Sequence, residues 1–383
     1  MRRFRLGVVV LIALALVAAA CGDDEAEEAA PATTAAPATT AAPATTEAPA
    51  EPLRIAFMYD GEIDDGGWNE AHENGRQYLI ANMDGIETTF VENLSPGSEF
   101  QAAFEDFGSQ GYDLVICTTW CQDDVLVVAP NYPDTVYLSW GGYQTAPNVG
   151  HFDGATEDGR YLDGLVAGSQ PGVELIGYVG GFAIEEVVRG VNAFMIGARE
   201  INPDIETQVV WVNSWYDPAA EQQAAQALVD AGADLLAAEV NAPAVASVAE
   251  GAGIGYIHYG IDGSGLAPNS WLSGFTFNWG PYYLSQAQAL ADGTWEPALT
   301  YGGLRDGVVG MSPFGDAVTA ETIALVEQRR QEIVDGTFDY FAGPITDNQG
   351  NVVVADGATI AWEERTLCCQ WLIEGVIGEI PAG

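Results

Sequence analysis

The chain has 383 residues, of which 55 are acidic and only 12 are basic, so its formal net charge is −43 at pH 7. So acidic a surface repels phosphate backbones, which argues against nucleic acid as a partner. All 12 basic residues are arginine, which excludes chemistry through a lysine Schiff base, and only 3 histidines are present. We expect no metal and no cofactor.

The N-terminus predicts an exported and lipid-anchored protein. Residues 1–20 read as a secretory signal peptide, in which three arginines precede an apolar run too short for a comfortable transmembrane span. The segment VAAACGDD resembles a bacterial lipobox, which implies cleavage before Cys21 and lipid, typically palmitate, on its sulfur. Residues 21–52 carry a PATTAA repeat that cannot build a core, so we expect a disordered tether. This organisation predicts an extracytoplasmic lipoprotein on the cell membrane.

From Leu53 the chain alternates short apolar runs with helical patterns. Such alternation is typical of parallel sheets that are covered by helices on both faces. Two successive series of this kind predict two similar α/β lobes, between which a ligand would lie in a cleft. We expect the lobes to comprise residues 53–171 with about 278–298, and 172–277 with about 299–340, while residues 341–383 form a tail packing on the lobes.

The stretch DGEIDDGGWNEAHENG, which follows the first expected strand, is the most informative motif. A strand, a tight turn and a helix, capped by Asp65 or Gly67, would place Trp68 and Asn69 at the carboxyl edge of a sheet. Open α/β sheets bind ligands at that edge. An ordinary turn with the Trp68 ring in the core remains the alternative.

Other expected strands also end in large aromatic residues beside Asp, Asn or Glu. Such a set describes a site for a flat heterocycle, although sugar sites share this chemistry. Any single tryptophan could equally well belong to the core. The expected ligand-binding residues are Trp68, Asn69, Trp120, Trp215, Glu239, Asn241, Asp262 and Trp279.

The four cysteines after Cys21 would lie in an oxidising environment. Cys117 and Cys121 are close together, and Cys368 and Cys369 are adjacent. A disulfide within the first pair or between the pairs fits this spacing, which leaves the pairing open. The CxxC spacing of a zinc site is absent.

Several long segments resemble the basic membrane protein family of substrate-binding lipoproteins of ABC transporters. They include DGGWNEAHENGR, IGYVGGFAIEEVVRGVNAFMIGAREINP, VVWVNSWYDPAAEQQAAQALVDAGAD, GPYYLSQAQALADGTW, DGVVGMSPFG and GPITDNQGNVVV. The resemblance covers nearly the whole chain after Leu53. It implies a type I periplasmic-binding-protein fold of two doubly wound parallel-sheet lobes, joined by a hinge of three crossovers around an interlobe cleft. Members of the family bind purine nucleosides, with the base between two aromatic rings and acidic residues on the ribose.

The resemblance assigns roles to particular residues. Asn69 matches an asparagine that reads the base, and Trp68 stands in a DGGW element of a branch resembling purine-nucleobase receptors. Trp215 matches the second aromatic ring, and Asp262 matches a ribose-binding aspartate of the nucleoside receptors.

The chain also departs from the nucleoside receptors. They carry a lysine near Thr276, and a glycine-rich turn where this chain has the sequence Glu-Val-Asn at 239–241. Both departures favour a free base such as adenine, guanine or hypoxanthine. Glu239 stands where the nucleobase branch would have a histidine, so the identity of the base stays open.

The sequence therefore predicts a monomeric substrate-binding lipoprotein of an ABC importer, which delivers a purine nucleobase to a membrane permease. A nucleoside receptor, or a sugar receptor of the same fold, is the alternative. A secreted hydrolase or deaminase acting on a heterocycle is the rival from another class, with adjacent acids such as Glu185 and Glu186 as an acid/base pair. Neighbouring residues point in different directions, and no catalytic motif is present, so we interpret these acids as solvated and expect no catalytic residue.

Overall fold

The computed structural model describes residues 51–381. The expected signal peptide, the lipid attachment site Cys21 and nearly all of the expected tether lie outside this range. In the part of the chain that is described, no helix is long and apolar enough to cross a membrane.

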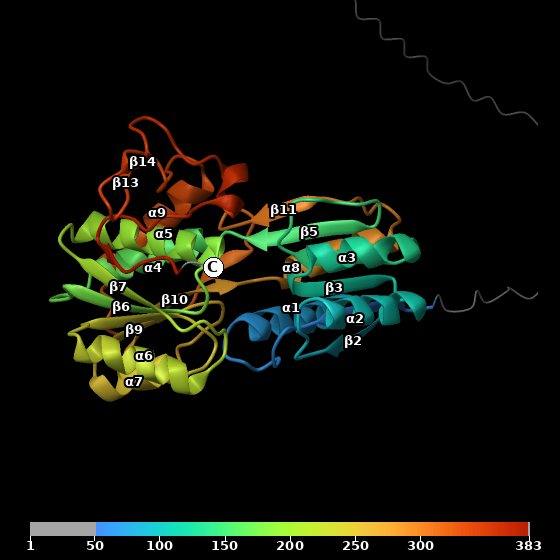
Figure 1. Ribbon diagram of the computed structural model, residues 1–383, viewed down its shortest axis with the longest axis horizontal. Coiled ribbons are helices and arrows are strands. Elements are labelled where there is room, and N and C mark those ends of the chain that lie inside the picture. Colours follow the sequence, from blue (N-terminus) through green and yellow to red (C-terminus); the bar gives the residue numbers. More distant parts are fainter. Residues whose placement is uncertain (1–50, 382–383) are drawn as a thin grey trace, which may run out of the picture. The chain divides into compact units, whose positions relative to one another are not determined.

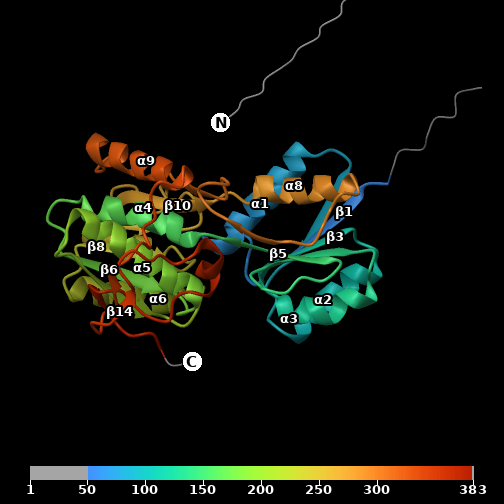
Figure 2. The same ribbon diagram turned by 90° about the horizontal axis from the view of Figure 1, so that it is seen from above.

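The first lobe contains a six-stranded sheet. Its strands are β1 (Leu53–Met58), β2 (Ile86–Val91), β3 (Leu114–Trp120), β4 (Val136–Trp140), β5 (Val149–Gly154) and β11 (Leu299–Gly302). Neighbouring strands are all parallel, in the spatial order β11-β5-β4-β3-β1-β2. The covering elements are α1 (Trp68–Asn82), α2 (Ser98–Ser109), α3 (Gln122–Val128), the 3₁₀ turn η1 (Ala129–Asn131) and α8 (Gly280–Ala291). Figure 2 shows α1 and α8 on one face of this sheet and α2 and α3 on the other.

The second lobe contains a seven-stranded sheet (Figure 1). Its strands are β6 (Leu175–Gly180), β7 (Glu206–Trp211), β8 (Leu235–Glu239), β9 (Gly255–His258), β10 (Trp271–Phe277), β12 (Val309–Met311) and β15 (Val376–Ile377). The spatial order is β12-β10-β9-β8-β6-β7-β15, and only β12 runs antiparallel to its neighbour. The helices are α4 (Thr156–Gly168), α5 (Glu185–Ile201), α6 (Pro218–Asp230), α7 (Ala244–Ala252) and α9 (Ala320–Val334).

The central strands explain the apolar runs of the sequence. β4 and β8 are buried at every residue, as parallel strands covered on both faces should be. One apolar cluster lies between α2, α3 and the first sheet, and another between α6, α7 and the second sheet. A third and larger cluster includes residues of α1, α4, α5 and both sheets. The predicted α/β fold with two parallel sheets is confirmed.

Helices α4 and α5 pack unusually closely because glycines face the partner backbone. A Cβ added to Gly164 would lie 2.0 Å from Phe194 O, and one added to Gly197 would lie 2.2 Å from Tyr161 O. Any larger side chain at either position would force the two helices apart. This contact fixes α4 in the second lobe, where it also packs against β10.

Within the described residues, the chain crosses between the lobes after β5, after β10 and after β11. These crossings differ from two boundaries expected from the sequence. Residues 156–171 were expected in the first lobe, but α4 packs on α5 and β10. Residues from about 299 were expected in the second lobe, but β11 pairs with β5 in the first sheet.

The C-terminal tail is held mainly on the second lobe. It contains the two-stranded pair β13 (Ile345–Thr346) and β14 (Val352–Val354), the 3₁₀ turn η2 (Trp362–Leu367), and then β15 on the edge of β7. Asn192 of α5 donates to Trp371 O at 2.9 Å and accepts from Ile373 N at 2.8 Å. The Trp362 ring meets Tyr301 of β11, with the ring centroids 4.8 Å apart.

The structure joins each cysteine after Cys21 to a near neighbour. Cys117 is bonded to Cys121, and Cys368 is bonded to Cys369. The sequence had left open whether a disulfide would run within a pair or between pairs.

Candidate functional site

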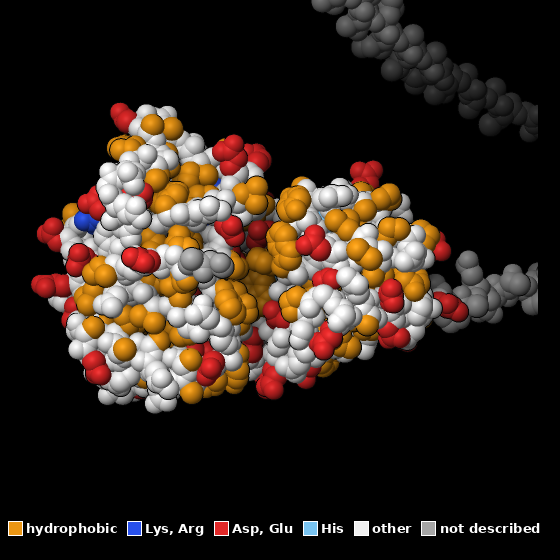
Figure 3. Space-filling model, in the orientation of Figure 1, with side chains coloured by type: hydrophobic (Ala, Val, Ile, Leu, Met, Phe, Trp, Pro, Cys, Tyr) orange, Lys and Arg blue, Asp and Glu red, His pale blue; other side chains and the backbone are white. Residues whose placement is uncertain are grey.

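A cavity of about 260 Å³ lies between the lobes, where the carboxyl ends of several strands meet. Figure 3 shows hydrophobic side chains gathered at this junction. We call it the aromatic cavity. Its lining residues are Asp60, Trp68, Thr119, Trp120 and Trp140 from the first lobe, and Phe182, Ile184, Glu186, Val187, Trp215, Glu239, Asn241 and Tyr259 from the second.

The aromatic walls are held in place by contacts with the backbone and with one another. Trp68 donates from Nε1 to Thr118 O at 2.8 Å, and its ring meets Trp140 edge-on at a centroid distance of 5.0 Å. In the second lobe, Trp215 packs edge-on against Phe182 at 5.1 Å. Gly181 lies beneath Trp215, where an added Cβ would come within 2.4 Å of the ring. These rings are therefore positioned by the protein itself, as a preformed site requires.

Asp65 caps α1 and orients Asn69. Its carboxylate accepts hydrogen bonds from the backbone N–H groups of Gly67 at 2.9 Å, Asn69 at 3.2 Å and Glu70 at 3.2 Å. It also accepts from Asn69 Nδ2 at 3.0 Å. The Asn69 side chain is buried, and its Oδ1 accepts no hydrogen bond within residues 51–381. A buried acceptor without a partner is costly, so this oxygen is suited to a ligand donor.

Two further cavities share lining residues with the aromatic cavity. A polar cavity of about 410 Å³ shares Asp60, Phe182, Trp215 and Asn241 with it, and includes Asn69. An outer cavity of about 790 Å³ is bordered by the C-terminal tail. The lining residues that it shares with the aromatic cavity are Trp120, Trp140, Ile184 and Glu186.

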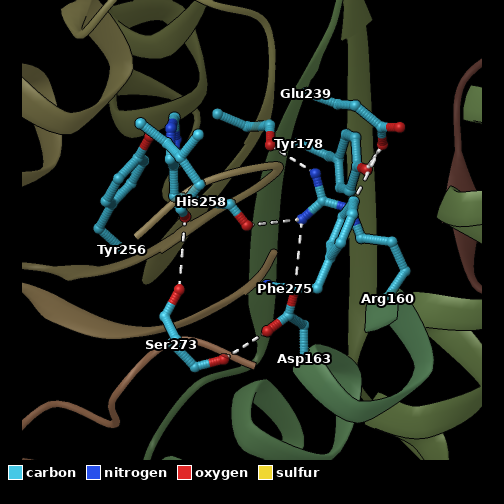
Figure 4. A network of polar contacts seen from close by, with 11 residues as sticks. Arg160, Asp163, Tyr178, Glu239, Tyr256, His258, Ser273 and Phe275 are labelled. Atoms are coloured by element: carbon cyan, nitrogen blue, oxygen red, sulfur yellow. Dashed lines mark hydrogen bonds and ion pairs between the residues drawn. The ribbon is translucent and has the colours of Figure 1, made fainter. Parts of the chain in front are cut away.

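Glu239 is fixed at the end of β8 by a buried polar network (Figure 4). Its Oε2 accepts from the Tyr178 hydroxyl and from Arg160 Nε, the latter at 3.3 Å. Arg160 is itself buried and donates to Ala238 O at 2.5 Å and to His258 O at 3.2 Å. Burial raises the pKa of Glu239, while the Arg160 guanidinium acts in the opposite direction. Arg160 therefore orients the carboxylate and favours its charged form.

Two more carboxyl groups line the aromatic cavity. Burial raises the pKa of Asp60 and of Glu186, and the nearby charges of Asp153 and Glu239 raise that of Glu186 further. The Thr156 hydroxyl donates to Glu186 Oε1 at 2.5 Å. Among the described residues, no arginine, lysine or histidine lines the aromatic cavity or the polar cavity.

The structure brings six of the expected site residues to these cavities. Trp279 is not among them: it is 1% exposed and stacks on His72, with ring centroids 4.9 Å apart and planes at 11°. Asp262 is exposed, and its Oδ1 accepts from Ser264 N at 3.0 Å within its own turn. The six are Trp68, Trp120, Trp215, Glu239 and Asn241 in the aromatic cavity and Asn69 in the polar cavity.

Sequence reasoning missed the start of α5 and Tyr259. We interpreted Glu185 and Glu186 alike as solvated acids; Glu185 is exposed, but Glu186 lines the aromatic cavity beside Val187. Tyr259 follows β9 directly and donates its hydroxyl to Asn241 Oδ1. Their position in the sequence could have identified both segments, because each follows a strand of the second sheet.

No metal site is evident. Across residues 51–381, no group of three or more His, Cys, Asp or Glu side chains is arranged to hold a metal ion.

Two α/β lobes with a preformed aromatic cavity between them define a binding protein for a small molecule. Residues 53–339 match the family described as "ABC transporter substrate-binding protein PnrA-like", known as Bmp, and the chain belongs to this family. The resemblance seen in the sequence is thereby confirmed. Membership implies a small-molecule ligand, a permease partner and a location outside the cytoplasm, and the family is one of binding proteins rather than enzymes.

Two curated relatives align along most of the chain. A purine-binding protein of Brucella abortus is 33% identical over 333 residues, which cover 86% of this chain and 95% of the relative. A Haloferax volcanii protein, provisionally named as an ABC transporter glucose-binding protein, is 32% identical over 333 residues, covering 87% of this chain and 82% of the relative.

A solved structure supports the fold. An ABC transporter solute-binding protein from Conexibacter woesei superposes with a TM-score of 0.65 at 24% identity, covering 75% of this chain and 98% of that chain.

Proposed function

We propose that the protein is the receptor of an ABC importer and binds a purine nucleobase, such as adenine or guanine, in the aromatic cavity. The observation that carries this proposal is the set of fixed aromatic rings around a cavity whose edges are carboxyl and amide groups. The 33% identity to a purine-binding protein over 86% of the chain supports the same ligand class.

The energy available from these groups is sufficient for a receptor. Stacking of a base on an aromatic side chain contributes about 1–3 kcal/mol. Two rings, such as Trp68 and Trp215, with a few buried hydrogen bonds can reach the roughly −8 kcal/mol of a micromolar complex. Closure of the lobes around the base would bury it from water and present the closed form to the permease.

A nucleoside is the second candidate, because the polar cavity adjoins the aromatic one. It shares Asp60 and Asn241 with the aromatic cavity and adds Asn93, Asn213 and Ser214, which suit the hydroxyl groups of a sugar. Asp262, the ribose ligand implied by the resemblance, lines neither cavity.

The remaining parts of the proposal concern delivery. A lipid on Cys21 anchors the monomeric receptor to the outer face of the membrane, and the tether lets the lobes reach the permease. Radiolabelled palmitate incorporated by the wild type, but not by Cys21→Ser, would support the anchor. Equal labelling of both would contradict it.

A thermal-shift screen of the purified protein against bases, nucleosides and sugars tests the ligand class. A ligand at 100 times its dissociation constant adds about 2.7 kcal/mol to the free energy of unfolding. A shift with bases supports the proposal, and shifts only with nucleosides support the second candidate. Shifts only with sugars, or conversion of a purine to a product, would contradict both.

A further inference from the structure

Several side-chain donors beside the aromatic cavity are already engaged within the protein, whereas some of its carboxylate acceptors are not. The amino groups of Asn69 and Asn241 are both directed to Asp65, at 3.0 and 2.6 Å. The Tyr259 hydroxyl already donates to Asn241 Oδ1. A buried N–H without a partner remains at Trp140 Nε1, within the described part of the chain. The donors left to a ligand are neutral groups, such as Trp140 Nε1 and the side chains of Asn93, Asn213 and Ser214 in the polar cavity.

Free acceptors, in contrast, are present on the second lobe. Both hydrogen bonds of Glu239 end on Oε2, and no donor from residues 51–381 reaches Oε1. Figure 4 shows the second carboxylate oxygen pointing away from Tyr178 and Arg160. Glu186 is engaged on Oε1 by Thr156, and its Oε2 accepts nothing from the same residues. Both side chains line the aromatic cavity.

The charges reinforce this imbalance. Asp60, Glu186 and Glu239 line the aromatic cavity, and the lining described above includes no cationic side chain. Arg160 lies behind Glu239 and is 0% exposed, so it neutralises that carboxylate without facing the ligand. An anionic ligand would meet dehydrated carboxyl groups and no donor of opposite charge, which is strongly unfavourable.

We infer that the cavity selects purines that bear an exocyclic amino group, and that Glu239 is the residue that reads this group. The inference rests on the proposed function and narrows it to aminopurines, among which guanine offers the most N–H groups. Hypoxanthine lacks the amino group and leaves Glu239 Oε1 without a donor. Urate and nucleoside monophosphates bring negative charge toward Glu239 and find no cationic side chain in the lining, so they are rejected.

The selectivity follows from the cost of an unmatched acceptor. Hydrogen bonds to an ionised carboxylate are roughly twice as strong as those between neutral groups. A site built to bond a ligand N–H discriminates against the analogue that lacks it, because its own polar group is then buried without a partner. We expect guanine to bind at least about tenfold more tightly than hypoxanthine, and adenine at least about tenfold more tightly than unsubstituted purine.

The test is titration calorimetry of the full protein with these matched pairs and with urate. Glu239→Gln keeps the shape of the side chain and should reduce both amino-group preferences to about threefold or less. Glu186→Gln should leave those preferences. At pH 9, above the pKa of about 8 to which burial raises the Glu186 carboxyl, it should weaken the rejection of urate. Glu185→Gln, on the neighbouring exposed side chain, is the matched control and should behave as the wild type. Thermal melts of each variant report whether it is folded.

The outcomes separate this inference from the proposed function. Equal binding of guanine and hypoxanthine by the wild type, or a preference unchanged in folded Glu239→Gln, overturns the inference and leaves a purine receptor. If Glu239→Gln does not fold, the wild-type preferences and the Glu186→Gln variant decide the question. Rejection of urate by Glu186→Gln that is as strong as in the wild type would then count against the inference. Failure of every purine to bind overturns both.

Discussion

Asn241 of the second lobe donates from Nδ2 to Asp65 Oδ2 of the first lobe at 2.6 Å. The same amide accepts from Trp68 N at 3.4 Å through Oδ1. Beside it, His258 Nε2 donates to Gly66 O at 2.8 Å. The loop that caps α1 and positions Trp68 is thus bonded to the opposite lobe. The same loop therefore positions the aromatic wall and carries hydrogen bonds between the lobes.

We expect Asn241→Ala to weaken ligand binding about tenfold to thirtyfold. The variant removes the hydrogen bonds to Asp65 and Trp68, each with a net worth of about 1 kcal/mol, so the lobes close less readily. Calorimetry with the best ligand measures the loss. Asn269→Ala, which removes a side-chain hydrogen bond to Glu250 inside the second lobe, is the control and should bind normally. Unchanged affinity in Asn241→Ala would show that this link does not contribute to closure.

Alanine substitution of two tryptophans should affect two different properties, ligand affinity in one case and stability in the other. Trp215→Ala removes a wall of the cavity and should weaken base binding by roughly tenfold to a hundredfold, with little effect on folding. Trp279→Ala empties a core position and should lower the free energy of unfolding by about 3–5 kcal/mol. Calorimetry and urea denaturation on both variants distinguish the two effects. Weak binding with normal stability in Trp279→Ala would return that residue to the site.

Arg160→Met should be among the most destabilising single substitutions in the second lobe. It leaves Glu239 and Asp163 buried without their cation, and breaking a buried ion pair costs about 3–5 kcal/mol. Arg330→Met removes an exposed contact to Glu327 at 3.8 Å and should change stability by less than about 0.5 kcal/mol. Urea denaturation gives both values. Similar stabilities for the two variants would mean that the buried network contributes little.

These contrasts show what the sequence could and could not specify. The strand–turn–helix pattern around Trp68 predicted an aromatic residue at a sheet edge, because the end of a strand and the start of a helix are encoded in the local sequence. Trp279 also lies just beyond a strand, two residues after β10 ends, yet its ring packs against α1 and stacks on His72. The direction of a side chain at a strand end depends on which helix packs there, and that is a tertiary property.

The lobe boundary was missed for a related reason. The helical pattern of α4 shows an apolar stripe but does not say which sheet the stripe covers. That choice is made by the close contact of Gly164 with Phe194 O, between segments distant in the sequence. The sequence likewise could not distinguish Glu186 from Glu185, because the direction of α5 decides which of the two side chains lines the aromatic cavity.

Several buried acids predict how stability depends on pH. Burial raises the pKa of Asp163 to about 7 and that of Asp158 to about 6, and it also raises that of Glu186. The folded protein therefore holds protons that the unfolded chain releases above about pH 4. The stability from these acids is full below that pH and is lost as the pH rises through the folded values. The three histidines oppose this trend. Burial lowers the pKa of His258 to about 4 and lowers the pKa values of the other two histidines as well, so their contribution to stability is lost as the pH falls below about 6.5.

Between pH 8 and pH 6 the acids dominate, because the histidines lose their contribution to stability only as the pH falls below about 6.5. We expect the free energy of unfolding to be about 2 kcal/mol higher at pH 6 than at pH 8, measured by urea denaturation at constant ionic strength. Glu186→Gln cannot take up its proton and should reduce this difference, whereas Glu185→Gln should keep it. A stability that falls between pH 8 and pH 6 would mean that these carboxyl groups are ionised in the folded protein. The charge around the cavity would then be more negative, and the preference for ligand N–H donors correspondingly stronger.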